Sequence, residues 1–65
     1  MIEVIGETAG EIWRLLSAEG ALSLSAIAQK VKRPETTVYM GIGWLAREDK
    51  LEFTKTNRGT SVSLK

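Results

Sequence analysis

The sequence predicts an α+β domain that is mainly helical, with three helices followed by a C-terminal β-hairpin. In three segments before Asp49, apolar side chains recur every three to four residues, the spacing of one helix face. After Asp49 the period falls to two, as on a strand with one covered face. Sixty-five residues are enough for a single domain, spanning residues 1–65. Without cysteine or histidine, such a short chain depends on a well-packed core or on a second copy.

The first helix is expected from Ile2 to Ala18, with Gly20 ending it in a left-handed conformation. Its core face carries Ile5, Ala9, Ile12 and Leu16, with Thr8 and Leu15 beside them. Gly6 and Gly10 each cost a helix up to about 1 kcal/mol relative to alanine. Their presence favours close approach of another backbone or a large side chain, from this chain or another. The alternative is a mediocre helix stabilised by tertiary packing.

The second and third helices are expected at residues 24–32 and 34–48. Ser23 is the predicted N-cap of the former, after a short extended piece at Leu22, and Ser25 is the alternative cap. Pro34 suits the first turn of the latter, because its missing N–H costs nothing there. The inward stripe of the third helix is Val38, Ile42 and Leu45, with Gly41 beside it. Its outward face is Thr36, Tyr39, Met40, Gly43 and Arg47, with Trp44 at the flank.

The hairpin is predicted from alternation in two runs separated by a turn at residues 56–59. Leu51 and Phe53 share one face of the first run, and Val62 and Leu64 share one face of the second. The turn contains asparagine and glycine, which tolerate the positive φ that hairpin turns need. A helix, a short strand, two helices joined by a tight turn and a terminal hairpin is the order of a winged helix-turn-helix.

Three features of the sequence occur together: Gly6, the segment Ala-Gly-Glu-Ile-Trp at residues 9–13 and the segment Gly-Ile-Gly-Trp-Leu-Ala-Arg-Glu-Asp-Lys at residues 41–50. With these features the chain resembles, over essentially its whole length, a family of small, stand-alone bacterial winged helix-turn-helix proteins without an established biochemical activity. Within the second segment, Gly-Trp-Leu-Ala-Arg-Glu is the most specific part. The resemblance implies the winged fold directly, and DNA binding only by analogy.

DNA binding is the leading functional interpretation, as a small transcriptional regulator. In helix-turn-helix proteins the second helix of the pair enters the major groove, which by resemblance is the third helix here. The expected contacts are mainly to phosphate, from the turn before that helix, from the helix itself and from the wing. The candidate residues are Lys30, Lys32, Arg33, Thr36, Thr37, Tyr39, Met40, Arg47, Lys55 and Arg58.

Other features point away from sequence-specific reading. Net charge is only +1, and Glu35 puts a negative charge at the end of the helix that would face phosphate. The outward face has no asparagine or glutamine and only one arginine, Arg47.

The alternative function is a protein-interaction or dimerisation module. In it Gly6, Gly10 and Trp13 would form a homodimer interface, since exposed tryptophan marks interfaces. Trp13 and Trp44 would otherwise close the edges of the core.

An enzyme is not expected, because the chain has no histidine or cysteine and no nucleophile–base pair. Residues 41–43, Gly-Ile-Gly, lie in a helical pattern and not between a strand and a helix, so they form no phosphate-binding loop. We expect no cofactor, no metal and no small-molecule substrate. The sequence has neither a membrane-spanning apolar run nor a signal-peptide pattern, so a cytoplasmic protein is expected.

Overall fold

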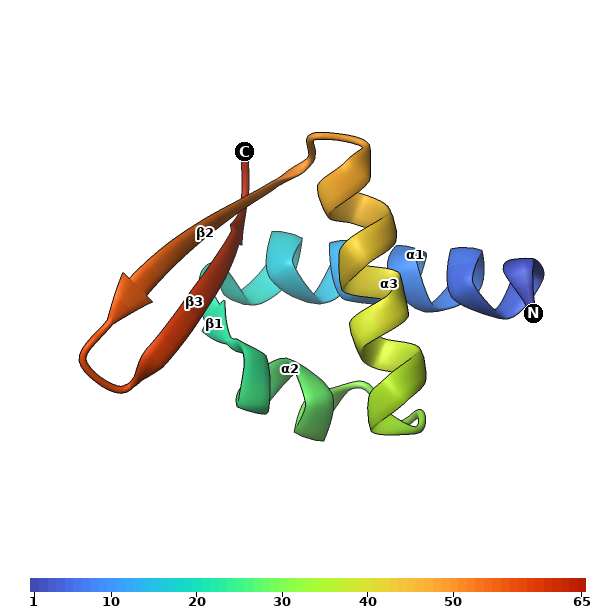
Figure 1. The fold of residues 1–65 in the computed structure, drawn as a ribbon, viewed down its shortest axis with the longest axis horizontal. Coiled ribbons are helices and arrows are strands. Elements are labelled where there is room, and N and C mark those ends of the chain that lie inside the picture. The colour runs from blue at the N-terminus through green and yellow to red at the C-terminus, as the bar shows by residue number, and fades with distance from the viewer.

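The computed structural model describes residues 1–65 and has three helices and a small antiparallel sheet (Figure 1). The elements follow one another in the predicted order. Their bounds are α1 Ile2–Glu19, β1 Leu22–Ser23, α2 Leu24–Lys30, α3 Glu35–Arg47, β2 Leu51–Thr56 and β3 Gly59–Leu64. The winged helix-turn-helix expectation is confirmed, with α2 and α3 as the helix pair and β2–β3 as the wing.

The sheet has the strand order β1-β3-β2, and both of its pairings are antiparallel. Leu22 of β1 pairs with Val62 of β3, so the short extended piece predicted near residue 22 is the third strand. On the other side of β3, Val62 pairs with Phe53 of β2. The short strand therefore ties the start of α2 to the base of the wing.

One core joins the helices to the base of the sheet. It consists of Ala9, Ile12, Leu16, Ile27, Val31, Val38, Ile42, Leu45, Leu51 and Val62. Of these, Ile12, Ile27, Val38 and Val62 have no exposed surface. Burying such a side chain stabilises the fold by about 1.5–3 kcal/mol relative to leaving it exposed. The predicted stripes of α1 and α3 therefore supply the core, and Thr8 of α1, also fully buried, donates its hydroxyl to the carbonyl oxygen of Val4 at 2.7 Å.

Among the glycines, Gly41 lies at a tight contact between helices, and the two glycines of α1 do not. A Cβ on Gly41 would lie 3.1 Å from both Ile12 Cδ1 and Thr8 Cγ2, and 3.2 Å from the Ala9 backbone nitrogen. At Gly6 nothing lies within 4 Å, and at Gly10 only the Arg14 guanidinium does, at 3.8 Å. Within this chain, the expected close packing at Gly6 and Gly10 is therefore wrong.

The boundaries of the helix pair differ from prediction by one or two residues. The Ser23 hydroxyl accepts from the Ala26 N–H at 3.1 Å, which confirms it as the N-cap. α2 ends at Lys30 and not at residue 32, because Val31 is already extended (φ −86°, ψ 113°). Pro34 is the N-cap of α3 and not its first helical residue, because its ψ of 143° is extended.

Two residues with positive φ end the long helices. Gly20 has φ 80° and ψ −153°, a conformation essentially reserved for glycine, so its positive φ is confirmed although the left-handed helical ψ is not. After α3, Asp49 has φ 61°. Its N–H bonds to the Ala46 carbonyl at 3.0 Å and the Lys50 N–H to the Leu45 carbonyl at 3.1 Å. Asp49 thus takes the position that glycine usually holds in a Schellman motif.

The wing is covered at its base and open toward its tip. Leu51 is buried, whereas Phe53, one step along the same face, is 46% exposed. A two-residue turn, Asn57–Arg58, joins the strands, and the Thr56 hydroxyl accepts from the Arg58 N–H at 3.3 Å. The turn is where the sequence places it, but positive φ falls on Gly59 (141°) and not on Asn57.

Candidate nucleic-acid interface and a two-tryptophan groove

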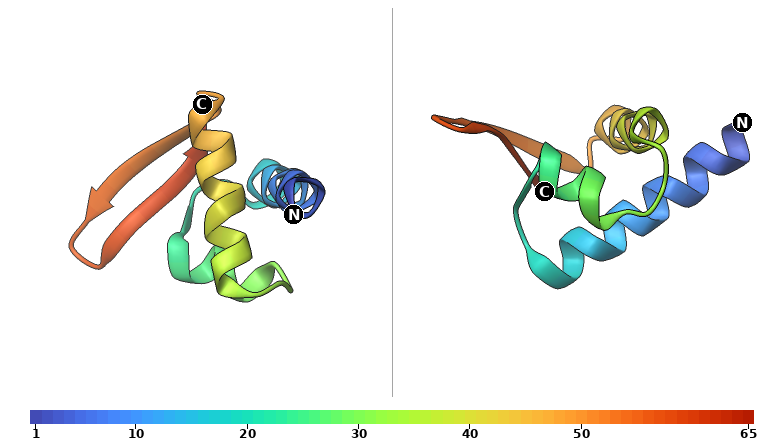
Figure 2. Two further views of the ribbon diagram at one scale, coloured as in Figure 1. Left: turned by 45° about the vertical axis from the view of Figure 1, so that its right-hand side comes forward. Right: turned by 90° about the horizontal axis from the view of Figure 1, so that it is seen from below.

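The outer face of α3 and the tip of the wing project to the same side of the molecule. The view from below in Figure 2 shows α3 and the wing tip along one edge and the C-terminal half of α1 along the other. A helix and a β-ribbon that protrude together match the way in which helix-turn-helix proteins approach a DNA groove.

The exposed face of α3 carries the residues predicted for it. Tyr39 is 44% and Met40 39% exposed, and Thr36, Gly43 and Arg47 are also exposed. Thr37 is different: it is only 9% exposed and belongs to the buried side of the helix. Adjacent helix positions point about 100° apart, so Thr36 and Thr37 do not share a face. Thr37 is therefore unsuited to the phosphate contact predicted for it.

Four of the predicted cations are free of ion pairs. They are Lys32 before α3, Arg47 at the end of α3, and Lys55 and Arg58 in the wing. Lys30 differs, since its Nζ lies 3.3 Å from Glu19 Oε1 on α1. An exposed pair of this kind is weak, but it directs the Lys30 side chain toward α1 and away from the outer face of α3.

Arg33 is held by α1. Its Nε and Nη2 donate to Glu11 Oε1 and Oε2 at 3.0 and 2.8 Å, and Nη2 also lies 3.6 Å from Glu7 Oε1. These hydrogen bonds lower the pKa of Glu11 and raise that of Arg33. A guanidinium already bonded bidentately to a carboxylate has to give up those bonds before it can reach a phosphate. The structure thus gives Arg33 a role in joining the turn to α1.

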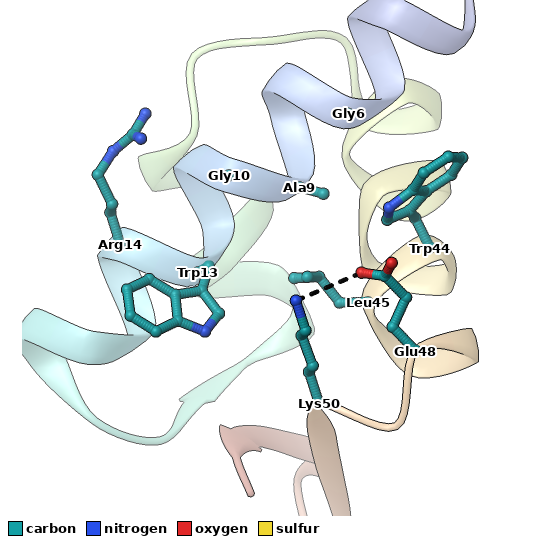
Figure 3. Close-up of a pocket in the computed structure, with 9 residues that line it drawn as sticks. All are labelled: Gly6, Ala9, Gly10, Trp13, Arg14, Trp44, Leu45, Glu48 and Lys50. Atoms are coloured by element: carbon teal, nitrogen blue, oxygen red, sulfur yellow. Dashed lines mark ion pairs between the residues drawn. The ribbon is translucent and has the colours of Figure 1, made fainter.

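A groove of about 490 Å³ lies between α1 and the C-terminal end of α3 (Figure 3). The small residues Gly6, Ala9 and Gly10 of α1 line it. Trp13 and Trp44 stand at its two sides, 45% and 39% exposed. The tryptophans therefore do not close the edges of the core, which was the alternative to an interface role. They flank a groove that includes the three residues predicted as an interface, Gly6, Gly10 and Trp13.

Charged side chains complete the groove, and sequence reasoning did not assign them to it. They are Arg14 from α1 and the pair Glu48 and Lys50 after α3, whose Oε1 and Nζ are 3.6 Å apart. Leu45 contributes from α3. Only the crossing of α1 and α3 brings these residues together, and no spacing within one helix predicts it.

The comparisons with known proteins agree with this architecture. A family model described as "Winged helix-turn-helix domain (DUF2582)" matches residues 1–64. This chain belongs to that family. The resemblance to a winged helix-turn-helix family without an established activity is thereby confirmed.

Two similar proteins show how much of the chain the similarity covers. The uncharacterized protein MJ1608 of Methanocaldococcus jannaschii is 48% identical over 65 residues, covering 94% of this chain and 90% of the relative. The solution NMR structure of protein BT2368 from Bacteroides thetaiotaomicron is similar with a TM-score of 0.84 at 27% identity. That match covers 95% of this chain and 76% of the other. The family establishes a fold on which DNA binding is common.

None of the three helices has the length and apolar character needed to cross a bilayer.

Proposed function

We propose that this protein binds double-stranded DNA as a small transcriptional regulator in the cytoplasm. α3 would lie in the major groove, and the wing would contact the neighbouring backbone. The observation that carries the proposal is the common direction of α3 and the wing tip, seen in Figure 2, together with the cations that these elements leave unpaired. The family's winged helix-turn-helix fold supports the same function.

The distribution of charge favours the side formed by α3 and the wing as the DNA-binding side, although the net charge is only +1. Ion pairs engage Lys30, Arg33, Lys50 and Lys65. On the α2–α3 turn, α3 and the wing, the unpaired cations are Lys32, Arg47, Lys55 and Arg58. Only Glu35 and Glu52 are unpaired carboxylates on the same elements. Phosphate contacts from such cations release counterions, which makes binding strongly dependent on salt.

The side chains on α3 favour recognition of shape and phosphate over reading of bases. Its exposed face offers Tyr39 and Met40 for van der Waals contact and Thr36 for a hydroxyl contact near the helix N-terminus. Arg47 is the one side chain there that is suited to bidentate pairing with guanine. Gly43 leaves a gap in the middle of the face. We therefore expect low discrimination between duplexes of different sequence.

The test is fluorescence anisotropy of a labelled random-sequence duplex titrated with the protein at low salt. We expect saturable binding that weakens steeply with added salt. The variants Lys55→Ala and Arg58→Ala should each weaken it and reduce the slope of log affinity against log salt by about one unit. The matched control is Lys65→Ala, which removes a cation already paired with Asp49 at 2.5 Å. A flat titration up to high micromolar protein contradicts the proposal.

The groove favours a second candidate function, a protein-interaction module that does not bind nucleic acid. Its supporting observation is the exposure of both Trp13 and Trp44 beside a hollow, since aromatic side chains are enriched in interfaces. If this is the only function, the anisotropy titration with duplex stays flat. Trp13→Ala then abolishes association with a partner protein or a second copy of the chain, and Arg58→Ala leaves that association unchanged.

A further inference from the structure

The flank of α1 that borders the groove is open to a second helix. Beyond the backbone of α1 itself, a Cβ on Gly6 would meet no atom within 4 Å, and a Cβ on Gly10 would meet only the flexible end of Arg14. Exposed apolar side chains lie along the same flank, with Ile2 70% and Trp13 45% exposed. Small residues allow two backbones to approach closely, while the larger side chains supply apolar area. The occupant of this surface should therefore be a helix that carries matching apolar and charged groups.

We propose that the occupant is α1 of a second copy, packed antiparallel so that Gly6 of each copy faces Gly10 of the other. The charges of α1 complement each other in this arrangement. Glu3 and Arg14 are both exposed and have no ion-pair partner within the chain. When Gly6 faces Gly10, Glu3 of one copy comes within one residue, about 1.5 Å along the axis, of Arg14 of the other.

The same register also pairs the apolar groups. Trp13 of one copy comes within one residue of Ile2 of the other, where each would cover the other's exposed surface. At about 100° per residue, Ile2 and Trp13 fall on one flank of the helix and Glu3 and Arg14 on the other. The two glycines lie between these flanks. Two further pairs of residues therefore favour the alignment in which Gly6 faces Gly10.

The flanks that meet across a two-fold axis favour the antiparallel direction. In an antiparallel two-fold pair, each flank of a helix meets the equivalent flank of its partner, so apolar meets apolar and Glu3 meets Arg14. A parallel pair would set the charged flank of one helix against Trp13 and Ile2 of the other. The proposed contact lies on the α1 side of the groove, and α3 and the wing remain free. A dimer would then present two DNA-binding faces, so this proposal stands separately from DNA binding.

Charge reversal and charge exchange test the register by sedimentation velocity over a concentration series at low salt. The natural protein should dimerise at tens of micromolar. Glu3→Arg and Arg14→Glu should each weaken dimerisation about ten-fold, because both symmetric ion pairs become repulsive. The double variant Glu3→Arg/Arg14→Glu should recover most of that loss. The control, Glu52→Arg, makes the same charge change on the wing and should leave dimerisation unchanged.

Two further readouts keep the test decisive. Reversal of Glu3 also opposes the dipole at the start of α1, so circular dichroism of the same samples must show that the fold is kept. In a mixture of differently labelled copies, NMR should detect an intermolecular contact between the Trp13 indole and the Ile2 methyl groups. A natural protein that stays monomeric up to millimolar concentration overturns the proposal. So does a dimer whose affinity the double exchange does not restore, or one without the Trp13–Ile2 contact.

Discussion

Arg33 of the α2–α3 turn donates two hydrogen bonds to Glu11 of α1, from Nε at 3.0 Å and from Nη2 at 2.8 Å. The two residues are 22 positions apart in the sequence. Their pair holds the start of α3, the helix that we propose to bind DNA, to α1 on the opposite side of the molecule. Lys32, the preceding residue, is exposed and unpaired. The structure therefore separates two neighbouring cations, since Arg33 is bonded to α1 and Lys32 is open to solvent.

Substitution of these neighbours should separate the two roles. Arg33→Ala should lower the free energy of unfolding, because it leaves the Glu11 carboxylate without its bidentate partner, and should change duplex affinity little. Lys32→Ala should do the reverse, with little change in stability and a salt slope reduced by about one unit. Urea denaturation and duplex anisotropy measure the two effects. An Arg33→Ala protein that is as stable as the natural one but binds duplex weakly would reverse this assignment.

The same pair should make stability depend on acid pH. Hydrogen bonding to Arg33 lowers the pKa of Glu11 below its ordinary value of 4.5, and burial opposes this only in part. Because the pKa is lower in the folded state than in the unfolded state, the contribution of Glu11 is complete above pH 4.5. It is lost as the pH falls through the folded-state pKa.

Glu11→Gln should therefore flatten the acid limb of a plot of unfolding free energy against pH. The measurement is urea denaturation at a series of pH values from about 6 to 2. Glu52→Gln, which removes an exposed wing carboxylate without an ion-pair partner, is the matched control. Equal acid limbs for Glu11→Gln and the natural protein would show that the pair does not stabilise the fold.

Two glycines of α3 should respond to alanine in opposite directions. At Gly41 a Cβ would press against the Ala9 backbone at 3.2 Å, which cannot move aside as a flexible side chain can. Gly41→Ala should therefore destabilise the protein by about 1–3 kcal/mol. Nothing lies within 4 Å of a Cβ at Gly43, so Gly43→Ala should stabilise α3 by up to about 1 kcal/mol. Thermal and urea denaturation of both variants check the contrast. Equal effects would place the helix crossing elsewhere.

The backbone at Asp49 predicts a stabilising substitution. Its φ of 61° is strained for a residue with a side chain, although aspartate tolerates it better than most. Asp49→Gly should raise the free energy of unfolding by roughly 0.5 kcal/mol, and Asp49→Ala should lower it by a similar amount. The ion pair with Lys65 is lost in both, so the comparison isolates the backbone. Urea denaturation in which alanine is the more stable of the two would contradict the assignment.

Periodicity predicted which residues of each element face inward, but not what they face. It correctly placed Val38, Ile42 and Leu45 in the core and Phe53 on the face of Leu51. It did not reveal that Phe53 extends beyond the helices that cover Leu51, because the length of a wing relative to its core is a tertiary property.

The remaining errors have the same origin. Glycine within a helix indicated close packing, yet the crossing of α1 and α3 puts the contact at Gly41 and leaves Gly6 and Gly10 at an open groove. The sequence places Arg33 among other cations near a turn, and only the folded chain brings Glu11 to it. Local spacing carries no information on contacts between residues far apart in the sequence.

The most direct test of the proposed function is an NMR titration of the ¹⁵N-labelled protein with a short random-sequence duplex. We expect amide shifts to change along the outer face of α3, at Tyr39, Met40 and Gly43, and at Lys55 and Arg58 in the wing. The amides of Gly6 and Gly10 should stay unchanged. Changes confined to the α1 groove, or none at millimolar duplex, would contradict DNA binding through α3 and the wing.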